Sequence, residues 1–169
     1  MSKLSNLARA LVRSVWIACL TVPLAAASAQ SPEDLKAYSD YKLTLENYQQ
    51  YLDAALNLAN VAVMDPQVAE RLNIMGTEPL AEQVKQLDGF PEARAAIAKT
   101  GLTTRDFVLA QGAALQAGKA HSLVKSGKLT ADRAIKKPGV SRANLEFFQK
   151  NEARISRLVQ DYVERRPKT

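Results

Sequence analysis

His121 is the side chain best suited to proton transfer near neutral pH, and it is the single histidine of the sequence. No acidic residue lies within four positions of it. The adjacent Ser122 would point about 100° away on a helix, so the two do not form a nucleophile and its base. His121 also falls on an apolar stripe, which is typical of a buried histidine. We therefore expect no catalytic residues and no enzyme; the alternative is a hydrolase or lyase in which the fold brings a distant carboxylate to His121.

Metal and cofactor ligands are scarce in the same way. Past residue 29 the chain has no cysteine and a single histidine, so a zinc site of the usual composition, a Glu-x-x-His di-iron site and a covalently attached haem all lack ligands. Calcium and magnesium sites need a loop dense in carboxylates, and the sequence has none. We expect neither a metal nor a cofactor.

The first 29 residues have the three regions of a secretory signal peptide. A basic start is followed by an apolar run over residues 15–26 and by the small residues 27–29, Ala-Ser-Ala. The run is shorter than the ~20 residues that span a bilayer, which favours cleavage after Ala29 over a retained anchor. We predict a periplasmic or secreted protein whose residues 30–169 form one domain.

Cys19 lies inside this leader and is the only cysteine of the chain. The sequence Ile17-Ala18-Cys19 resembles the end of a bacterial lipoprotein signal, in which the cysteine is acylated. Trp16 stands where that pattern usually has leucine, and the residues after Cys19 are still apolar. We expect Cys19 to be removed with the leader, which leaves a domain without disulfides.

Charge is distributed unevenly along the domain. Residues 30–118 carry a net charge of −5, and residues 119–169 carry +8. The two parts either pack on each other or on a second copy, or the basic part binds an anionic partner. Most of its basic residues lie in a stretch from Lys119 to Arg142. No aromatic residue occurs between Val108 and Glu146, so this stretch lacks the stacking platform of single-strand nucleic-acid binders. We expect no nucleic-acid partner; the anionic partner, if there is one, would be a phosphate-rich surface of the cell envelope.

The elements that position these residues are predicted to be helices throughout. Apolar residues recur every three or four positions, and Ser, Thr, Pro and Gly stand where helices begin and end. The fold class is all-α, an irregular elongated bundle of three long helices plus several short ones. The predicted helices cover residues 31–65, 67–75, 79–87, 91–100, 103–126 and 141–164, with one turn after Thr130.

An uncharged heptad stripe runs along the predicted first helix, which would be ~50 Å long if straight. The stripe makes a homodimer through this helix possible, or it forms one wall of a tapered cleft. Its members are Tyr38, Tyr41, Leu45, Tyr48, Leu52, Ala55, Ala59 and Ala62.

The bulky start of this stripe supplies the candidate ligand-binding residues. In this interpretation a small apolar ligand lies between the tyrosines and the last helix, and the candidates are Tyr38, Tyr41, Tyr48, His121 and Asn144. The alternative is that the tyrosines are core or core-rim residues, which is how amphipathic aromatics usually sit.

Two stretches carry a resemblance. Residues 101–108 (GLTTRDFV), together with residues 138–147 (PGVSRANLEF) and Asn151, look like small exported bacterial helical proteins, a likeness that implies no activity. The pairs Leu102-Thr103 and Leu129-Thr130 are similar to motifs of the periplasmic stress chaperones of the Spy and CpxP type. Asp106 and Arg133 replace the glutamines of those motifs.

These observations predict an exported, non-enzymatic helical protein of the cell envelope that binds or interacts with a partner. The alternatives are a carrier of a small apolar ligand in a cleft of the bundle, and a chaperone-like binder of client proteins. After removal of the leader we expect no transmembrane segment.

Overall fold

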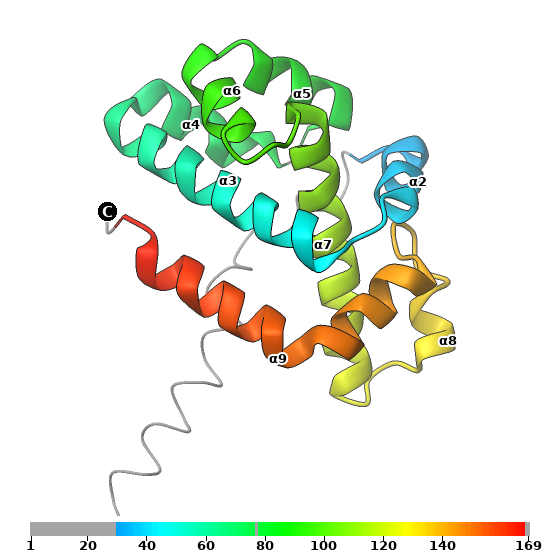
Figure 1. Ribbon diagram of the computed structural model, residues 1–169. Helices are drawn as coiled ribbons and strands as arrows, with labels where there is room; N and C mark the ends of the chain where they lie inside the picture. Colours follow the sequence, from blue (N-terminus) through cyan, green and yellow to red (C-terminus); the bar gives the residue numbers. More distant parts are fainter. Residues whose placement is uncertain (1–29, 77, 168–169) are drawn as a thin grey trace, which may run out of the picture.

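The computed structural model describes residues 30–76 and 78–167. In this part of the chain every regular element is a helix and no strand occurs, which confirms the all-α prediction (Figure 1). The predicted signal peptide and Cys19 lie outside the described residues. The helices are α2 (Pro32–Asp40), α3 (Leu45–Met64), α4 (Pro66–Met75), α5 (Leu80–Asp88), α6 (Pro91–Ala98), α7 (Thr104–Lys125), α8 (Ala131–Ala134) and α9 (Arg142–Arg165).

The predicted helix over residues 31–65 is wrong in one respect, because the structure divides it into α2 and α3. Residues 41–44 are non-helical, and the chain changes direction between the two helices (Figure 1). Thr44 begins α3 with a capping box, in which its side chain and that of Asn47 each accept the other residue's backbone N–H. The break also has a partner far along the chain, Asn144, described below.

The helix α7 connects the two ends of the molecule. It contacts α5 and α6 near its beginning, α2 near its middle, and α8 and α9 in its second half (Figure 1). The helix α3 lies across it and contacts α4, α6, α7 and α9. Because α3 is covered on several sides, all eight residues of the predicted stripe are buried or half-buried within one chain.

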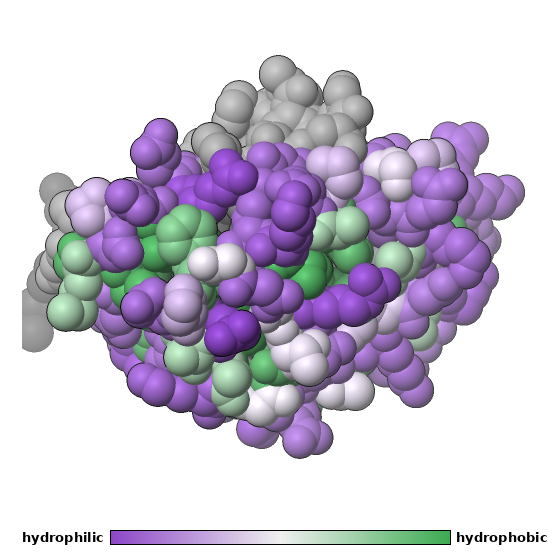
Figure 2. All heavy atoms as spheres, turned by 90° about the horizontal axis from the view of Figure 1, so that it is seen from above, coloured by the Kyte–Doolittle hydropathy of each residue, from purple (hydrophilic) through white to green (hydrophobic). Residues whose placement is uncertain are grey.

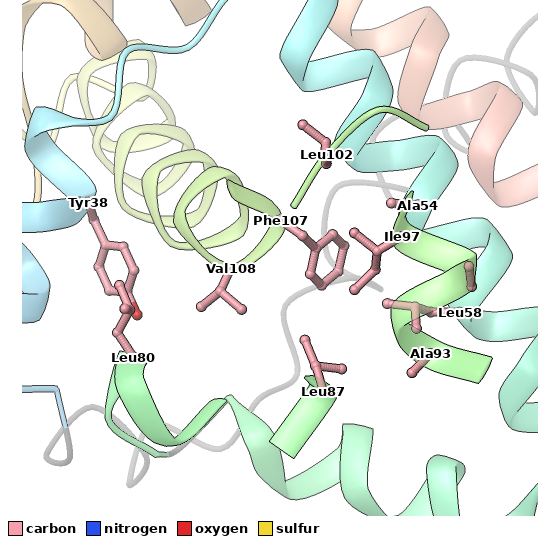
Figure 3. Close-up of a cluster of buried hydrophobic side chains, with 11 residues drawn as sticks. Tyr38, Ala54, Leu58, Leu80, Leu87, Ala93, Ile97, Leu102, Phe107 and Val108 are labelled. Carbon is pink, nitrogen blue, oxygen red and sulfur yellow. The ribbon is translucent and has the colours of Figure 1, made fainter. Parts of the chain in front are cut away.

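The largest core cluster joins α2, α3, α5, α6 and the beginning of α7. Figure 3 shows Phe107, Ile97 and Leu87 pointing toward one another from α7, α6 and α5, with Leu58 of α3 behind them. Tyr38 reaches toward the same cluster from α2, on the other side of Val108. These side chains bury the apolar faces of helices too short to be stable alone.

Two smaller clusters fix α9. Its residues Phe147, Phe148 and Ile155 pack with Tyr48 of α3 and with alanines of α7. Further toward α8, Leu145 and Val140 pack with Ala120 and Ala134. Small residues on α7 let the neighbouring helices approach closely.

The helix α2 approaches α7 closely at one glycine. The ring of Tyr38 lies on Gly112, where a Cβ would stand 2.3 Å from two ring carbons. Only glycine leaves space for an aromatic ring at this position.

Helix boundaries follow local chemistry in most places. Ser31, Thr103, Thr130 and Ser141 cap their helices, each accepting a backbone N–H with its side chain. The local sequence does not predict the kink in α9 at Asn151, whose φ of −113° and ψ of 15° are non-helical. The side chain of Asn151 donates to the carbonyl of Phe147 at 2.8 Å.

Candidate functional site

His121 lies at the joint between α7 and α9, and the fold brings a carboxylate to it. Its Nε2 is 3.6 Å from Oε2 of Glu152, which directly follows the kink in α9. The other oxygen of Glu152 pairs with Lys125, one turn further along α7. The imidazole ring stacks on Phe148, with ring centroids 6.2 Å apart. The acid that sequence reasoning could not find near His121 is therefore Glu152, from another helix.

Burial favours the neutral form of this histidine. Only 8% of its side chain is exposed, and burial lowers its pKa below the ordinary value of 6.5, while Glu152 opposes that shift. The hydrogen bond from Lys125 holds the pKa of Glu152 below its ordinary value. Glu152 is thus an ionised partner of Lys125 first and a neighbour of His121 second.

The geometry is unfavourable for acid-base catalysis. The distance of 3.6 Å exceeds a hydrogen bond, and neither ring nitrogen of His121 has a hydrogen-bond partner among the described residues. His121 is buried against Phe148 and Glu152, and it lines neither of the two hollows described below. The joint packs α7 against α9.

Tyr48 and Tyr41 pack in the core cluster that contains the apolar side chains of α9. Tyr48 is 6% exposed and lies 5.8 Å from Phe147 and 5.9 Å from Phe148 between ring centroids. Tyr41 is half-buried beside this cluster, and burial, with Asp106 nearby, raises its pKa. Both tyrosines therefore contribute to packing between α3 and α9.

Tyr38 lies elsewhere, in the cluster on the opposite part of α7. It is 1% exposed, and burial together with the charge of Asp34 raises its pKa to about 12, against the hydrogen bond that its hydroxyl makes with Gln83. The structure thus brings together Tyr41, Tyr48 and His121 around α9 and keeps Tyr38 apart from them.

Asn144 is fully buried and is occupied by backbone groups of the break between α2 and α3. Its Oδ1 accepts the N–H of Leu43 at 2.9 Å, and its Nδ2 donates to the carbonyl of Tyr41 at 2.8 Å. One side-chain amide therefore satisfies two backbone groups that the non-helical turn leaves unpaired. In this structure its hydrogen-bonding capacity serves the fold.

A small hollow lies between α3 and α9, near the position where a tapered cleft was predicted. Its volume is about 30 Å³, which is enough for one or two water molecules. Leu52, Leu56 and Leu158 form its apolar part, and an ion pair between Asp53 and Arg165 at 3.4 Å lies at its edge. It is too small for a ligand of drug size.

The charged surface around α8 is the most distinctive feature outside the core. Residues 119–142, here called the basic end, hold one acidic residue, Asp132, and seven basic ones. All seven are exposed. They come from the second half of α7, from α8 and its flanking loops, and from the first turn of α9, which gather at one end of the molecule (Figure 1). They are Lys119, Lys125, Lys128, Arg133, Lys136, Lys137 and Arg142.

Few of these charges are neutralised within the chain. Arg142 pairs with Asp132 at 3.6 Å and Lys125 pairs with Glu152. The other five form no ion pair with any described residue. Sequence reasoning located this stretch but could not tell whether acidic residues of the first part of the chain cover it. In the structure they leave it open.

Apolar surface, by contrast, is scattered. Figure 2, seen from above relative to Figure 1, shows small hydrophobic areas separated by hydrophilic side chains. Among the side chains that the structure describes, the exposed large hydrophobic ones are Val63, Met64 and Val163. No helix among residues 30–76 and 78–167 is both long and apolar enough to cross a membrane. The described side chains contain no cluster of three or more His, Cys, Asp or Glu suited to a metal ion.

Comparisons of the chain with protein-family models, with curated proteins and with solved structures gave no match.

Proposed function

We propose that this is an exported, non-enzymatic binding protein of the cell envelope, and that the basic end is its binding surface for a phosphate-bearing anionic layer. In this proposal the three longest helices, α3, α7 and α9, form the frame of an irregular bundle that holds α8 and its loops at one end. The single observation that carries the proposal is the exposure of seven basic side chains, five of them without an ion-pair partner in the described chain.

Electrostatics explain why such a surface favours an anionic layer over a single anion. The charges lie on several loops and helix ends rather than in one pocket, so they match an extended field better than a point charge. A basic residue near an anionic membrane surface contributes about 1 kcal/mol, and the effect decays within a Debye length. The leader-like residues 1–29 support a location where such surfaces are accessible.

Vesicle binding tests the proposal. The exported protein, purified from the envelope of an expression host with its N-terminus determined by mass, is sedimented with vesicles of phosphatidylglycerol and phosphatidylcholine. The variant Arg133→Gln/Lys136→Gln/Lys137→Gln removes three exposed, unpaired charges. At about 1 kcal/mol each, the partition coefficient should fall about a hundredfold.

A matched control removes three charges elsewhere. Arg94, Lys99 and Arg105 are also exposed and outside the ion pairs, and they lie on α6, directly after it and at the beginning of α7, at the opposite end. The control triple should bind nearly as well as the natural protein, and added salt should weaken binding in both. The proposal would be contradicted if both triple variants lost the same amount of vesicle binding. It would also be contradicted if the natural protein bound pure phosphatidylcholine vesicles as well as those that contain phosphatidylglycerol.

The chaperone-like activity and the homodimer through the first helix stay predictions. No specific contact among the described residues favours either one.

A further inference from the structure

A second hollow, of about 370 Å³, opens on the surface between α2 and the loop that leads into α9. This volume lies at the lower end of the range found for ligand pockets. Its lining is apolar at four positions and contains two lysines and no acidic residue. The lining residues are Pro32, Leu35, Lys36, Ser39, Lys137, Pro138, Gly139 and Val140.

The walls of this hollow are fixed by backbone geometry. Gly139 has a φ of +78°, and a Cβ there would stand 2.9 Å from Gln116 and 3.3 Å from Leu35. The loop backbone therefore lies directly against both α2 and α7. On the other wall, the capping box at Ser31 fixes the beginning of α2. A hollow with fixed walls loses little conformational freedom when it is filled.

The two lysines are available to a ligand. Lys137 has no ion-pair partner among the described residues and belongs to the basic end. Lys36 pairs with Asp40, but both side chains are mostly exposed, 74% and 61%, and a pair of this kind contributes little. An anion with two or more acceptor oxygens can therefore compete for Lys36.

Apolar walls beside two cations, at the edge of a larger basic surface, complement an amphiphile with an anionic head. We propose that this hollow binds one acyl chain of an anionic phospholipid, with the phosphate near Lys36 and Lys137. This inference rests on the proposed function, because it names the lipid that the basic end would meet, and it adds a site at which a single molecule is held.

A chain-length series tests the acyl site. Lysophosphatidylglycerols with chains of eight, ten, twelve and fourteen carbons are titrated into the exported protein by calorimetry, below their micelle concentrations. Each methylene that enters an apolar site strengthens binding about fourfold until the hollow is full. We expect a rise of this kind followed by a plateau, with one molecule bound per chain. An affinity independent of chain length would overturn the inference.

Two further ligands separate the head group from the chain. Glycerophosphoglycerol has the same phosphate without a chain and should bind far more weakly than the twelve-carbon lipid. Lysophosphatidylcholine has the chain but no net charge, and it should bind more weakly than lysophosphatidylglycerol to the natural protein. This difference in affinity should become smaller in Lys137→Gln and disappear in Lys36→Gln/Lys137→Gln. If the head group alone binds as tightly as the lipid, the site is a phosphate site and the acyl proposal is wrong.

Ser39→Trp fills the hollow from the half-buried edge of α2, and Ser122→Trp places the same side chain on an exposed face of α7 as its control. The first variant should lose affinity for the twelve-carbon lipid by about tenfold or more, and the second should not. Equal affinities in both variants would overturn the site.

The vesicle experiment above distinguishes the two proposals. If vesicles bind through the basic end while no lysolipid binds, the acyl site fails and the proposed function stands. If lysolipid binds with the expected chain-length dependence while the two triple variants bind vesicles equally well, the proposed function fails and the acyl site stands.

Discussion

Replacing Asn144 with alanine should lower the free energy of unfolding strongly, although the asparagine carries no charge. Its side chain is fully buried and makes two hydrogen bonds across the break between α2 and α3, to Leu43 at 2.9 Å and Tyr41 at 2.8 Å. The alanine variant leaves one buried N–H and one partly buried carbonyl unpaired. At about 1 to 3 kcal/mol for the first and about 1 kcal/mol for the second, the free energy of unfolding should fall by about 2 to 4 kcal/mol.

Urea denaturation followed by circular dichroism measures this loss. With a slope of about 2 kcal/mol per molar urea, typical of small domains, the midpoint should fall by about 1 to 2 M while the slope stays unchanged. Asn60→Ala is the matched control, because Asn60 is exposed within α3 and makes no hydrogen bond through its side chain to a described residue. That variant should stay within about 0.5 kcal/mol of the natural protein.

Asn144→Asp tests the direction of the bonds. The carboxylate can accept from Leu43 but cannot donate to Tyr41, and it adds a charge at a buried position. The loss should be at least that of the alanine variant. If Asn144→Ala unfolds at the same urea concentration as Asn60→Ala, the amide does not hold the break, and the account of the α2–α3 turn is wrong.

Two further predictions concern packing and pH. Gly112→Ala should cost about 1 to 3 kcal/mol of stability, because the new Cβ would lie 2.3 Å from the ring of Tyr38, whereas Gly118→Ala, with Phe148 at 3.5 Å, should be neutral or stabilising in the same urea assay. Burial lowers the pKa of His121, so the unfolded chain binds its proton first, and stability should fall as the pH drops below about 6.5. His121→Phe should remove this part of the pH dependence. If the free energy of unfolding changes equally with pH in both proteins between about pH 7.5 and pH 5.5, His121 is not the source of this pH dependence.

Local signals predicted the helices well because helix ends are decided by neighbouring residues. Ser31, Thr103, Thr130 and Ser141 each cap the helix that follows, and even the single turn of α8 begins where Thr130 indicates. The pair Glu146 and Lys150 forms at 2.9 Å, because residues four positions apart are neighbours on the surface of α9.

Long-range contacts explain what the sequence pattern missed. The turn over residues 41–44 is held by Asn144, about a hundred residues further along the chain. Because the local sequence carries no sign of this contact, the apolar stripe that crosses the turn predicts one continuous helix. Arg165 pairs with Asp53 on α3, although Asp161 stands four residues before it on α9, the spacing at which helical charge pairs form. Glu152 reaches His121 only because α7 and α9 pack together.

The candidate residues divide in the same way. Sequence reasoning placed Tyr38, Tyr41 and Tyr48 on one stripe, and the break after α2 separates the first from the last by turning the chain. The basic stretch was visible in the sequence, but its exposure depends on where the acidic part of the chain folds. The hollow beside Gly139 joins α2 to a loop about a hundred residues later, and no local pattern announces it.

The most direct measurement asks which end of the protein meets an anionic membrane. Residues 30–169 contain no cysteine, so in this part of the chain an environment-sensitive dye can be placed alone at Ser126→Cys, within the basic end, or at Ala98→Cys, at the exposed end of α6. With phosphatidylglycerol vesicles, the dye at position 126 should shift its emission to the blue, and the dye at position 98 should not. A shift at position 98, or at neither position, would contradict the central claim.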